Sequence, residues 1–363
     1  MDGVRAVIEH RLSDVRKAIS ALGADCMLVS SPENCLYLSS FTGEGRLLVC
    51  SRGQMLMTDS RYVEQAAAEA PEFQVVTVTG EYAEAVNSLV ADLSITCLCF
   101  EESHLTFKEY ADLRKALGTV ELKPVSNVVE SLRMRKTSEE VNSIRKAAHL
   151  TDMAFEHILE MVRPGVTELE IAIEMEFFMR RNGASASAFP IIIASGARGS
   201  LPHGTASSKP LRFGEMITID AGAVVDHYCS DMTRTISLGE PPLEIRKVYD
   251  VVLEAQQAAV ASVRPGMRLR DIDAVARDIM ARAGYGSYFG HGLGHGVGLA
   301  VHEPPRLSPK APPDGLVENG MVFTVEPGVY IPGLGGVRIE DTVWVHDDMV
   351  EILTMTPKRL IVL

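Results

Sequence analysis

The stretch Thr218-Ile-Asp-Ala-Gly222 returns later in the chain as Thr324-Val-Glu-Pro-Gly328, and these two related segments decide the fold. Each is followed by a second strand-like segment with another carboxylate, Asp231-Met-Thr233 after the first and Glu340-Asp-Thr342 after the second. Alternation of residue character is typical of β-strands, because successive side chains point to opposite faces. The sequence therefore predicts two related hairpins, each with two carboxylates.

Helical segments repeat in the same order around these hairpins. Val162-Arg-Pro-Gly165 recurs as Val263-Arg-Pro-Gly266, and each copy lies between two helical stretches. The second helical stretch ends at Gly183 in one copy and at Gly284 in the other. Two copies are too few for a solenoid, which needs about three repeats. We therefore predict a single pseudo-symmetric domain in which two helix–helix–hairpin halves close on a shared site.

The first predicted hairpin gives Asp220 and Asp231 a common face. Alternate residues of a strand share a face, so Asp220 lies with Thr218 and Gly222 and not with the apolar residues between them. A turn near Asp226-His227 would then bring Asp220 directly opposite Asp231. We therefore expect these two carboxylates to be cross-strand neighbours.

The second hairpin repeats the arrangement with glutamates. A turn around Gly333 would bring Glu326 opposite Glu340. Like charges that face each other destabilise a sheet, and clustered carboxylates raise each other's pKa. A cation should therefore lie among the four carboxylates, and two divalent metal ions would offset their four negative charges.

A glycine-rich stretch with two histidines, Gly290-His-Gly-Leu-Gly-His-Gly-Val-Gly298, lies between the hairpins and is followed by His302. Alternating glycines allow the backbone to come close to a crowded site. One imidazole among carboxylates favours Mn²⁺ or Co²⁺, with Zn²⁺ or Fe²⁺ as alternatives. The stretch does not satisfy G-x-G-x-x-G, and the chain contains neither H-E-x-x-H nor G-x-S-x-G. These absences argue against a dinucleotide site, a zincin and a serine hydrolase.

The N-terminal part has a different pattern, in which helical and strand-like segments alternate. Residues 1–126 are predicted to form an α/β domain with a hairpin across Arg52-Gly53 and a turn at Pro32-Glu-Asn34. Residues 127–363 are predicted to form the domain that contains the duplication. Its long first helix should begin at Thr137, since Thr137-Ser-Glu-Glu140 has the spacing of a capping box.

The composition narrows the possible partners. The chain has 363 residues, a net charge of −13 and no basic run, which argues against nucleic acid and anionic membranes. No apolar run is long enough for a membrane span, and the charged N-terminal segment does not resemble a signal peptide. The six cysteines lack the spacing of a zinc ribbon. We expect them to be buried free thiols in a cytoplasmic protein.

The five residues Asp220, Asp231, His295, Glu326 and Glu340 resemble the metal ligands of the pita-bread metallopeptidases, a family that includes creatinase, aminopeptidase P and prolidase. Further blocks are similar to the proline-specific branch of that family: Pro202-His-Gly204, Ser230-Asp-Met-Thr-Arg234, Val325-Glu-Pro-Gly-Val-Tyr330 and Gly336-Val-Arg-Ile-Glu-Asp341. The resemblance implies an α+β fold, a pita-bread catalytic domain with an internal pseudo-two-fold duplication after an α/β creatinase-type N-terminal domain. Creatinase itself lacks the metal ligands, so its activity is not the one implied.

The resemblance also implies roles for single residues. One metal ion would be held by Asp231, His295 and Glu340, and the other by Asp220, Asp231, Glu326 and Glu340, with Mn²⁺ as the first choice. The catalytic residues would be His302, which stabilises the oxyanion, Glu326, which transfers a proton, and His203. Substrate would be bound by His203, His291, Tyr330 and Arg338. For Arg338, contact with a substrate carboxylate and a salt bridge to a ligand carboxylate are both open.

The activity implied is hydrolysis of the bond between an N-terminal residue and a following proline. Its substrate would be a small peptide with proline at the second position, and the enzyme would be an Xaa-Pro aminopeptidase or an Xaa-Pro dipeptidase. The family commonly forms dimers, so a homodimer is expected. The alternatives are a hydrolase similar to methionine aminopeptidase and a non-catalytic binding module on the same fold.

Overall fold

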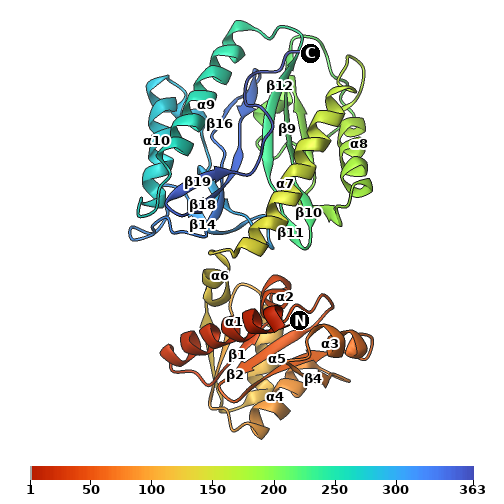
Figure 1. The fold of residues 1–363 in the computed structure, drawn as a ribbon, viewed down its shortest axis with the longest axis vertical. Helices are drawn as coiled ribbons and strands as arrows, with labels where there is room; N and C mark the ends of the chain where they lie inside the picture. The colour runs from red at the N-terminus through yellow and green to blue at the C-terminus, as the bar shows by residue number, and fades with distance from the viewer. Residues whose placement is uncertain (1) are drawn as a thin grey trace. The chain divides into compact units, whose positions relative to one another are not determined.

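The structure, a computed structural model, describes residues 2–363, which divide into two compact units with the boundary between Arg133 and Met134 (Figure 1). The sequence placed the boundary after residue 126. The difference is the short helix α6 (Val128–Arg133), which belongs to the first unit. Val129 of this helix is buried, and Arg133 donates a hydrogen bond of 2.7 Å to the side-chain oxygen of Asn34.

The first unit is built around a six-stranded sheet in the order β4-β3-β2-β1-β5-β6. The strands β1, β5 and β6 are parallel, as are β3 and β4, whereas β2 runs antiparallel to both of its neighbours. The strands are β1 (Cys26–Val29), β2 (Arg46–Cys50), β3 (Gly53–Thr58), β4 (Gln74–Thr77), β5 (Cys97–Glu101) and β6 (Glu121–Val125). The helices before α6 are α1 (Asp2–Ala21), α2 (Pro32–Ser39), α3 (Val63–Glu69), α4 (Tyr82–Asp92) and α5 (Phe107–Leu117). The predicted α/β alternation and the hairpin across Arg52-Gly53 are confirmed.

Two predictions for the first unit are wrong. Pro32-Glu-Asn34 is not an isolated turn but the start of α2, because the Ser31 side chain accepts a hydrogen bond from the Asn34 backbone and proline fits the first helical turn. The cysteines are not all free thiols. Cys26 and Cys50 are register partners on β1 and β2, and they form a disulfide that sequence spacing did not indicate.

The first half of the second unit places two packed helices beside short antiparallel sheets. Its helix α7 begins as predicted, since Thr137 and Glu140 each accept a hydrogen bond from the other's backbone N–H. The sheets have the orders β12-β9-β8 and β11-β10-β7. The elements are α7 (Ser138–Leu159), α8 (Glu168–Arg181), β7 (Ala186–Ser187), β8 (Ile192–Ser195), the 3₁₀ helix η1 (Gly196–Ser200), β9 (Glu215–Ala221), β10 (Ala223–Val225), β11 (Tyr228–Cys229) and β12 (Met232–Leu238).

The second half repeats this plan with α9 (Leu243–Ser262) packed on α10 (Leu269–Arg282). The helices α8 and α10 end just before Gly183 and Gly284, which both have positive φ angles of 111° and 88°. Beside the helices lie a sheet in the order β14-β13-β15-β18-β19 and a β16-β17 ribbon. The remaining elements are η2 (Gly286–Tyr288), β13 (Gly294–Gly296), β14 (Glu303–Leu307), β15 (Val322–Val325), β16 (Gly328–Ile331), β17 (Gly335–Arg338), β18 (Asp341–His346) and β19 (Met349–Ile352). The predicted duplication is confirmed.

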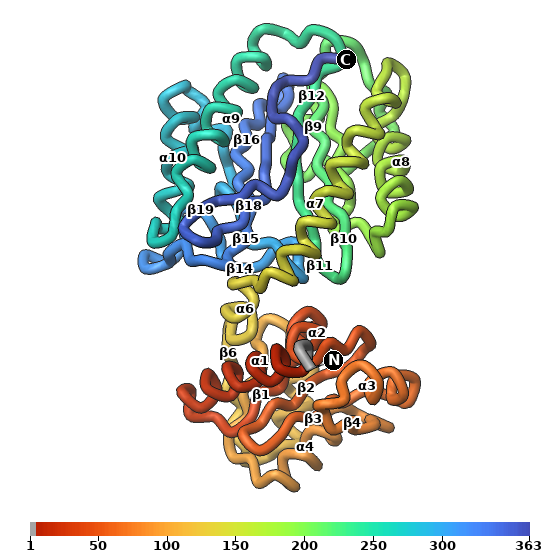
Figure 2. Tube along the Cα trace, in the orientation of Figure 1, coloured from red at the N-terminus to blue at the C-terminus, as the bar shows by residue number. Residues whose placement is uncertain are grey.

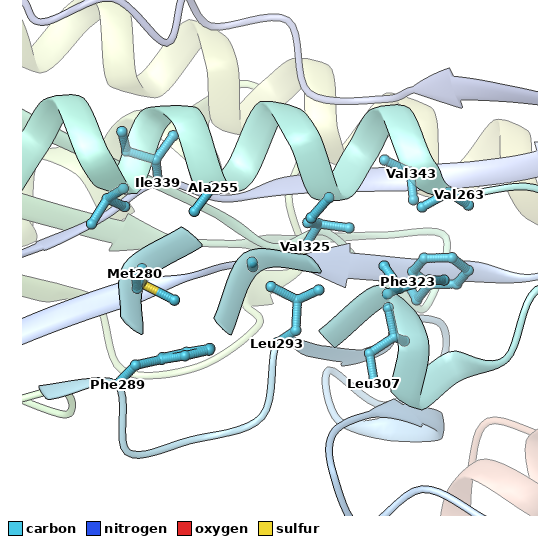
Figure 3. Packing of buried hydrophobic residues seen from close by; sticks show 14 of the residues in the cluster. Ala255, Val263, Met280, Phe289, Leu293, Leu307, Phe323, Val325, Ile339 and Val343 are labelled. Atoms are coloured by element: carbon cyan, nitrogen blue, oxygen red, sulfur yellow. The ribbon is translucent and has the colours of Figure 1, made fainter. Parts of the chain in front are cut away.

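Apolar side chains join the helices of each half to its strands. In the second half, residues of α9 and α10 such as Ala255 and Met280 pack with strand residues such as Phe323 and Val325 (Figure 3). The first half has an equivalent core between α7, α8 and the β8-β9-β12 sheet. Figure 2 shows the strands of the two halves side by side in the middle of the unit. They are linked there by the Glu340 backbone N–H, which donates to the Thr233 carbonyl at 3.1 Å.

The register of the first hairpin differs from the predicted one. Its turn does consist of Asp226-His227, and both residues have positive φ angles, 51° and 70°, as a tight two-residue turn requires. Counting outward from this turn, however, Asp220 pairs with Thr233 and not with Asp231. Because the error is two residues, Asp231 stays on the same face and is a diagonal neighbour of Asp220.

The second hairpin has the predicted register. The ladder on both sides of Glu326 has the pairing in which Glu326 faces Glu340. The chain reverses at Gly333, whose φ angle is 79°. None of the helices among residues 2–363 has the length and apolar character needed to cross a lipid bilayer.

Candidate active site

One cavity of the second unit is lined by all the residues that the sequence singled out. Its volume is about 1040 Å³, which is at the upper end of the range for small-molecule sites. The lining includes the five predicted metal ligands and the five other predicted site residues: Asp220, Asp231, His295, Glu326, Glu340, His203, His291, His302, Tyr330 and Arg338. Both halves of the duplication contribute to this cavity, so the structure brings the predicted site residues together.

His295 lies on β13, the strand between β14 and β15. The glycines on either side of it allow this close packing. A Cβ atom on Gly294 would overlap the Thr324 carbonyl, and one on Gly296 would overlap the Pro304 carbonyl. The His295 backbone N–H donates to the Thr324 hydroxyl at 3.1 Å. The glycine-rich stretch therefore places one imidazole deep among its neighbours.

The imidazole of His295 is directed at the carboxylates. Its Nδ1 lies 3.2 Å from the Gly296 carbonyl, a hydrogen bond for which Nδ1 must carry the proton. Its Nε2 lies 3.1 Å from Glu326 Oε1 and 3.6 Å from Asp231 Oδ2. Asp231, His295 and Glu340 offer ligand atoms that all lie within 4.8 Å of one another. These three residues are therefore close enough to share one cation.

Asp220 and Glu340 each accept a hydrogen bond on only one of their two carboxylate oxygens within residues 2–363. Thr233 donates to Glu340 Oε2 at 2.6 Å, and Arg338 Nη2 donates to Asp220 Oδ2 at 2.5 Å. The remaining oxygens, Asp220 Oδ1 and Glu340 Oε1, are buried and have no hydrogen-bond partner within residues 2–363. A buried polar atom without a partner costs free energy, so these oxygens indicate that the site receives a ligand.

The pKa directions agree with this geometry. Burial raises the pKa of Asp231 and of Glu340 well above the usual range, and the neighbouring carboxylates raise both further. Burial also raises the pKa of Asp220, although Arg338 opposes the shift. Burial alone would raise the pKa of Glu326 too, but the hydrogen bond from His295 and nearby positive charges lower it to about 2. Ionisation of all these carboxylates together is therefore unfavourable unless a further cation lies among them.

This donor set fits divalent metal ions. It combines four carboxylates with one imidazole, the mixture of hard oxygen ligands and a nitrogen that first-row divalent ions accept. A cation would also supply the missing partner for the buried oxygens of Asp220 and Glu340. Within residues 2–363, Arg338 forms a hydrogen bond with only Asp220 among the four carboxylates, so it does not compensate the other three in this way.

Arg338 is fixed by several protein acceptors. Besides Asp220, its guanidinium donates to the Thr233 hydroxyl at 3.0 Å, to the Tyr330 hydroxyl at 2.9 Å and to the Pro202 carbonyl at 3.2 Å. Of the two roles that the sequence left open, the structure contains the salt bridge to a predicted ligand. Contact with substrate stays a prediction.

The other histidines lie around the carboxylates. His291 Nε2 is 3.0 Å from the Tyr330 hydroxyl, and burial lowers the pKa of His291. The His302 ring lies edge-on to that of His295, with 4.2 Å between ring centroids and 82° between planes. Burial and the nearby His295 lower the pKa of His302 to about 4, so His302 is neutral at pH 7. His203 is exposed where it lines the cavity.

Comparison with family models decides the affiliation. The model of Metallopeptidase family M24 matches residues 142–347, and that of the Creatinase/Prolidase N-terminal domain matches residues 11–135. The chain belongs to metallopeptidase family M24. The resemblance inferred from the sequence is therefore confirmed, as are the creatinase-type domain, the pita-bread domain and the conclusion that this M24 peptidase is a metal-dependent hydrolase.

Individual M24 relatives are similar over nearly their whole length. The structure of the Xaa-Pro dipeptidase from Bacillus anthracis has a TM-score of 0.95 and 43% identity, covering 98% of this chain and 100% of that one. The X-Pro aminopeptidase from Thermotoga maritima has a TM-score of 0.85 and 38% identity, covering 94% and 98%. The Xaa-Pro dipeptidase of Pyrococcus furiosus is 36% identical over 98% of this chain and 100% of its own.

Two cations of this M24 peptidase were not anticipated from the sequence. Arg306 and Lys310 are exposed side chains that line the cavity, and neither forms an ion pair within residues 2–363. The signal that would have found them is their position shortly after His302, in a segment that lines the cavity.

Arg234 was noticed only as part of a family motif, yet it lies directly behind the M24 carboxylates. It is only 2% exposed, and it donates to the Glu340 carbonyl and, at 2.9 Å, to the Thr233 carbonyl. Its Nη2 also donates to Asp341 Oδ1 at 2.8 Å. Arg234 therefore ties the two hairpins together, a role that the sequence does not show because Glu340 and Asp341 come from the other half.

Proposed function

We propose that this enzyme is an Xaa-Pro dipeptidase, which hydrolyses the bond between the N-terminal residue and proline in dipeptides. The observation that carries the proposal is the carboxylate–imidazole cluster, two of whose buried oxygens have no hydrogen-bond partner within residues 2–363. The same cavity is also lined by Arg306 and Lys310, which form no ion pair in that part of the chain. The relatives named as Xaa-Pro dipeptidases from Bacillus anthracis and Pyrococcus furiosus support the choice of bond. The methionine-aminopeptidase-like and binding-module alternatives are not favoured.

For the metal ions we propose the ligands expected from the sequence. Asp231, His295 and Glu340 would hold one ion, and Asp220, Asp231, Glu326 and Glu340 the other. Mn²⁺ is proposed because oxygen ligands outnumber the one nitrogen. When bound, such ions lower the pKa of water and polarise a carbonyl group. Metal-free enzyme reloaded separately with Mn²⁺, Co²⁺, Zn²⁺ or Fe²⁺ should be most active with Mn²⁺.

The side chains around the cluster would manage protons and charge. Glu326 is ionised at neutral pH because its pKa is lowered to about 2, so its carboxylate can accept a proton from the attacking water and pass it to the leaving nitrogen. His302 is neutral at pH 7 and offers a ring N–H to the oxyanion that forms at the scissile carbonyl. His203 lines the same cavity and would be a second donor.

The proline half of the substrate would lie against His291 and Tyr330, which contact each other at 3.0 Å. Its carboxylate needs a cation with free donors. Arg338 already uses its donors on protein acceptors, whereas Arg306 and Lys310 line the cavity without an ion pair within residues 2–363. We therefore propose Arg306 and Lys310 as the residues that recognise the terminal carboxylate and favour a dipeptide.

Hydrolysis of Ala-Pro and Ala-Pro-Ala by the Mn²⁺-loaded enzyme tests the proposal. We expect Ala-Pro to have the higher kcat/KM, and replacement of Arg306 by Met to raise the KM for Ala-Pro by about 10-fold or more. A preference for Ala-Pro-Ala would make the enzyme an X-Pro aminopeptidase instead. Cleavage of Met-Ala-Ser but of neither proline peptide would contradict the Xaa-Pro specificity. The expected homodimer and cytoplasmic location stay predictions.

A further inference from the structure

A buried ion pair lies beside the cavity but outside the proposed ligand set. Lys136 Nζ is 2.7 Å from Glu303 Oε1, and the two side chains are only 2% and 4% exposed. Removing two charges from water costs several kcal/mol, so such a pair persists only where further contacts support it. Glu303 directly follows His302, so any role of the pair bears on the placement of that histidine.

The Glu303 carboxylate folds back over the loop that connects His295 to His302. Its Oε2 accepts a hydrogen bond of 3.3 Å from the backbone N–H of Ala300. It occupies the space beside Gly298, where a Cβ atom would overlap the carboxylate. The loop is therefore shaped around this carboxylate, and Gly298 is the residue that makes room for it.

The loop between His295 and His302 is also hydrogen-bonded to the strand β11. The Gly298 carbonyl accepts a hydrogen bond of 2.8 Å from the backbone N–H of Cys229, and the Gly298 N–H donates to the Ala300 carbonyl at 3.1 Å. Cys229 lies on β11, two residues before Asp231. The loop is thus held between β11 and the Glu303 carboxylate, with His302 at its end.

Lys136 is itself fixed to the framework of the second half. Its backbone N–H donates to the Gly320 carbonyl at 2.8 Å, and the Gly320 N–H donates to the Val345 carbonyl on β18 at 2.7 Å. Its ammonium group is therefore a fixed point and not a mobile surface charge. Through Glu303 this fixed charge sets the end of the loop that places the His302 ring 4.2 Å from that of His295.

We infer that Lys136 and Glu303 are positioning residues that hold His302 in its place across the active site from the ligand His295. The inference rests on the role proposed for His302. Neither residue lines the cavity, so both act through the loop and not on the substrate.

A double-mutant cycle with His302 tests the inference. Lys136→Met should lower kcat for Ala-Pro by about 10- to 100-fold with little change in KM and unchanged metal content, as loss of an outer partner usually does. In a His302→Ala background the same change should alter kcat by less than about twofold, because it acts through a residue that is already absent. An equal loss in both backgrounds, or no loss in either, would overturn the inference.

Two further variants guard against misfolding and generic effects. Lys136→Met removes the positive charge beside the buried Glu303 carboxylate, which is itself destabilising. The neutral pair Lys136→Met/Glu303→Gln is therefore carried through the same cycle, with the same expected outcomes. Arg135→Met is the matched control. It removes a neighbouring but exposed ion pair with Glu318, with side chains 57% and 50% exposed, and it should leave kcat unchanged.

A readout without catalysis separates this inference from the proposed function. The measurement is an NMR spectrum of histidine-labelled, metal-free protein, in which the imidazole signals of His302 are identified by their loss in His302→Ala. They should move or broaden in the neutral-pair variant and stay in place in Arg135→Met. Unmoved His302 signals in the neutral pair would overturn the inference. A wild-type enzyme that cleaves no proline peptide would instead refute the proposed function alone.

Discussion

Glu340 and Asp341 are adjacent, both are almost completely buried, and yet their surroundings are opposite. Glu340 accepts a hydrogen bond from Thr233 on one oxygen, while its other oxygen has no partner within residues 2–363. Both oxygens of Asp341 are fully occupied. Four side chains donate to them: Arg234, Thr354, Gln256 and Lys358.

The pKa directions of the two residues differ accordingly. Burial raises the pKa of Glu340, and the neighbouring carboxylates raise it further. Burial would raise the pKa of Asp341 as well, but the charges of Arg234 and Lys358 outweigh it and lower the pKa. Burial by itself therefore does not distinguish a structural carboxylate from a ligand. Complete partnering identifies Asp341 as part of the scaffold, and the open oxygen of Glu340 supports its proposed role as a metal ligand.

The largest effect is expected from Glu340→Gln. We predict that kcat/KM falls by more than about 1000-fold, beyond the loss for one missing oxyanion donor, because a proposed ligand of both ions is lost. Metal content should fall with it. The metal-free protein should keep its stability, since the change removes a buried charge that lacks a partner. A loss of stability in the metal-free variant would contradict the conclusion that Glu340, unlike Asp341, does not stabilise the fold.

Asp341→Asn should have the converse result. It leaves Arg234 and Lys358 without their anionic partner, and we predict a loss of about 3–5 kcal/mol in the free energy of unfolding, as for other broken buried pairs. Urea unfolding of the metal-free protein can be followed by the fluorescence of Trp344, the one tryptophan of the chain, which lies in the second unit. Glu340→Gln is the matched control for an adjacent buried carboxylate.

His302→Ala should separate the loss of catalysis from the loss of metal binding. We predict that kcat falls by about 100- to 1000-fold, as for removal of one oxyanion donor. Metal content should stay at the wild-type level, because the proposed ligand His295 is untouched. Turnover at the wild-type rate would remove His302 from the mechanism, and loss of metal would place it with Glu340 in the ligand set.

The smallest effect concerns Glu109, a partnered carboxylate of the first unit. Burial would raise its pKa, but hydrogen bonds from Arg46 and Thr106 lower it from 4.5 to about 2. The ionised form is therefore favoured in the folded state, and its contribution is present above pH 4.5 and lost as the pH falls toward 2. Because the site is partly exposed, Glu109→Gln should cost only about 0.5–1 kcal/mol at pH 7.

Calorimetric unfolding at pH 7 and near pH 2 checks this prediction. The wild-type and Glu109→Gln proteins should differ in the unfolding temperature of the first unit at pH 7 and converge at the acid end. A difference that stays the same near pH 2 would show that the contribution of Glu109 does not depend on its charge.

Local patterns in the sequence were sufficient for much of the fold. The capping box at Thr137, the turn at Asp226-His227 and the facing of Glu326 and Glu340 all follow from residues close to one another in the chain. The one register error, Asp220 with Asp231, arose although the turn was located correctly. Strand period fixes the face of a residue, but its partner depends on counting from the turn, and an error of two residues leaves every face unchanged.

Contacts between distant segments could not be obtained in this way. The disulfide between Cys26 and Cys50 depends on strand pairing, and the burial of Arg234 depends on carbonyls from the other half. The ion pair between Arg338 and Asp220, which are 118 positions apart in the chain, likewise depends on tertiary structure. Residue type and spacing carry no information on which of several cations will reach a given carboxylate.

The duplication, the two-part chain, the candidate metal ligands and the family could be predicted from the sequence, because each of these rests on short motifs with fixed spacing. The folded chain was needed to show which carboxylate oxygens stay open and that Arg338 is committed to Asp220. It was also needed to pair Lys136 with Glu303, the contact through which Lys136 supports the His302 loop. The physical reason is that burial and hydrogen-bond partnering arise when both halves close on one cavity, and neither half contains that information alone.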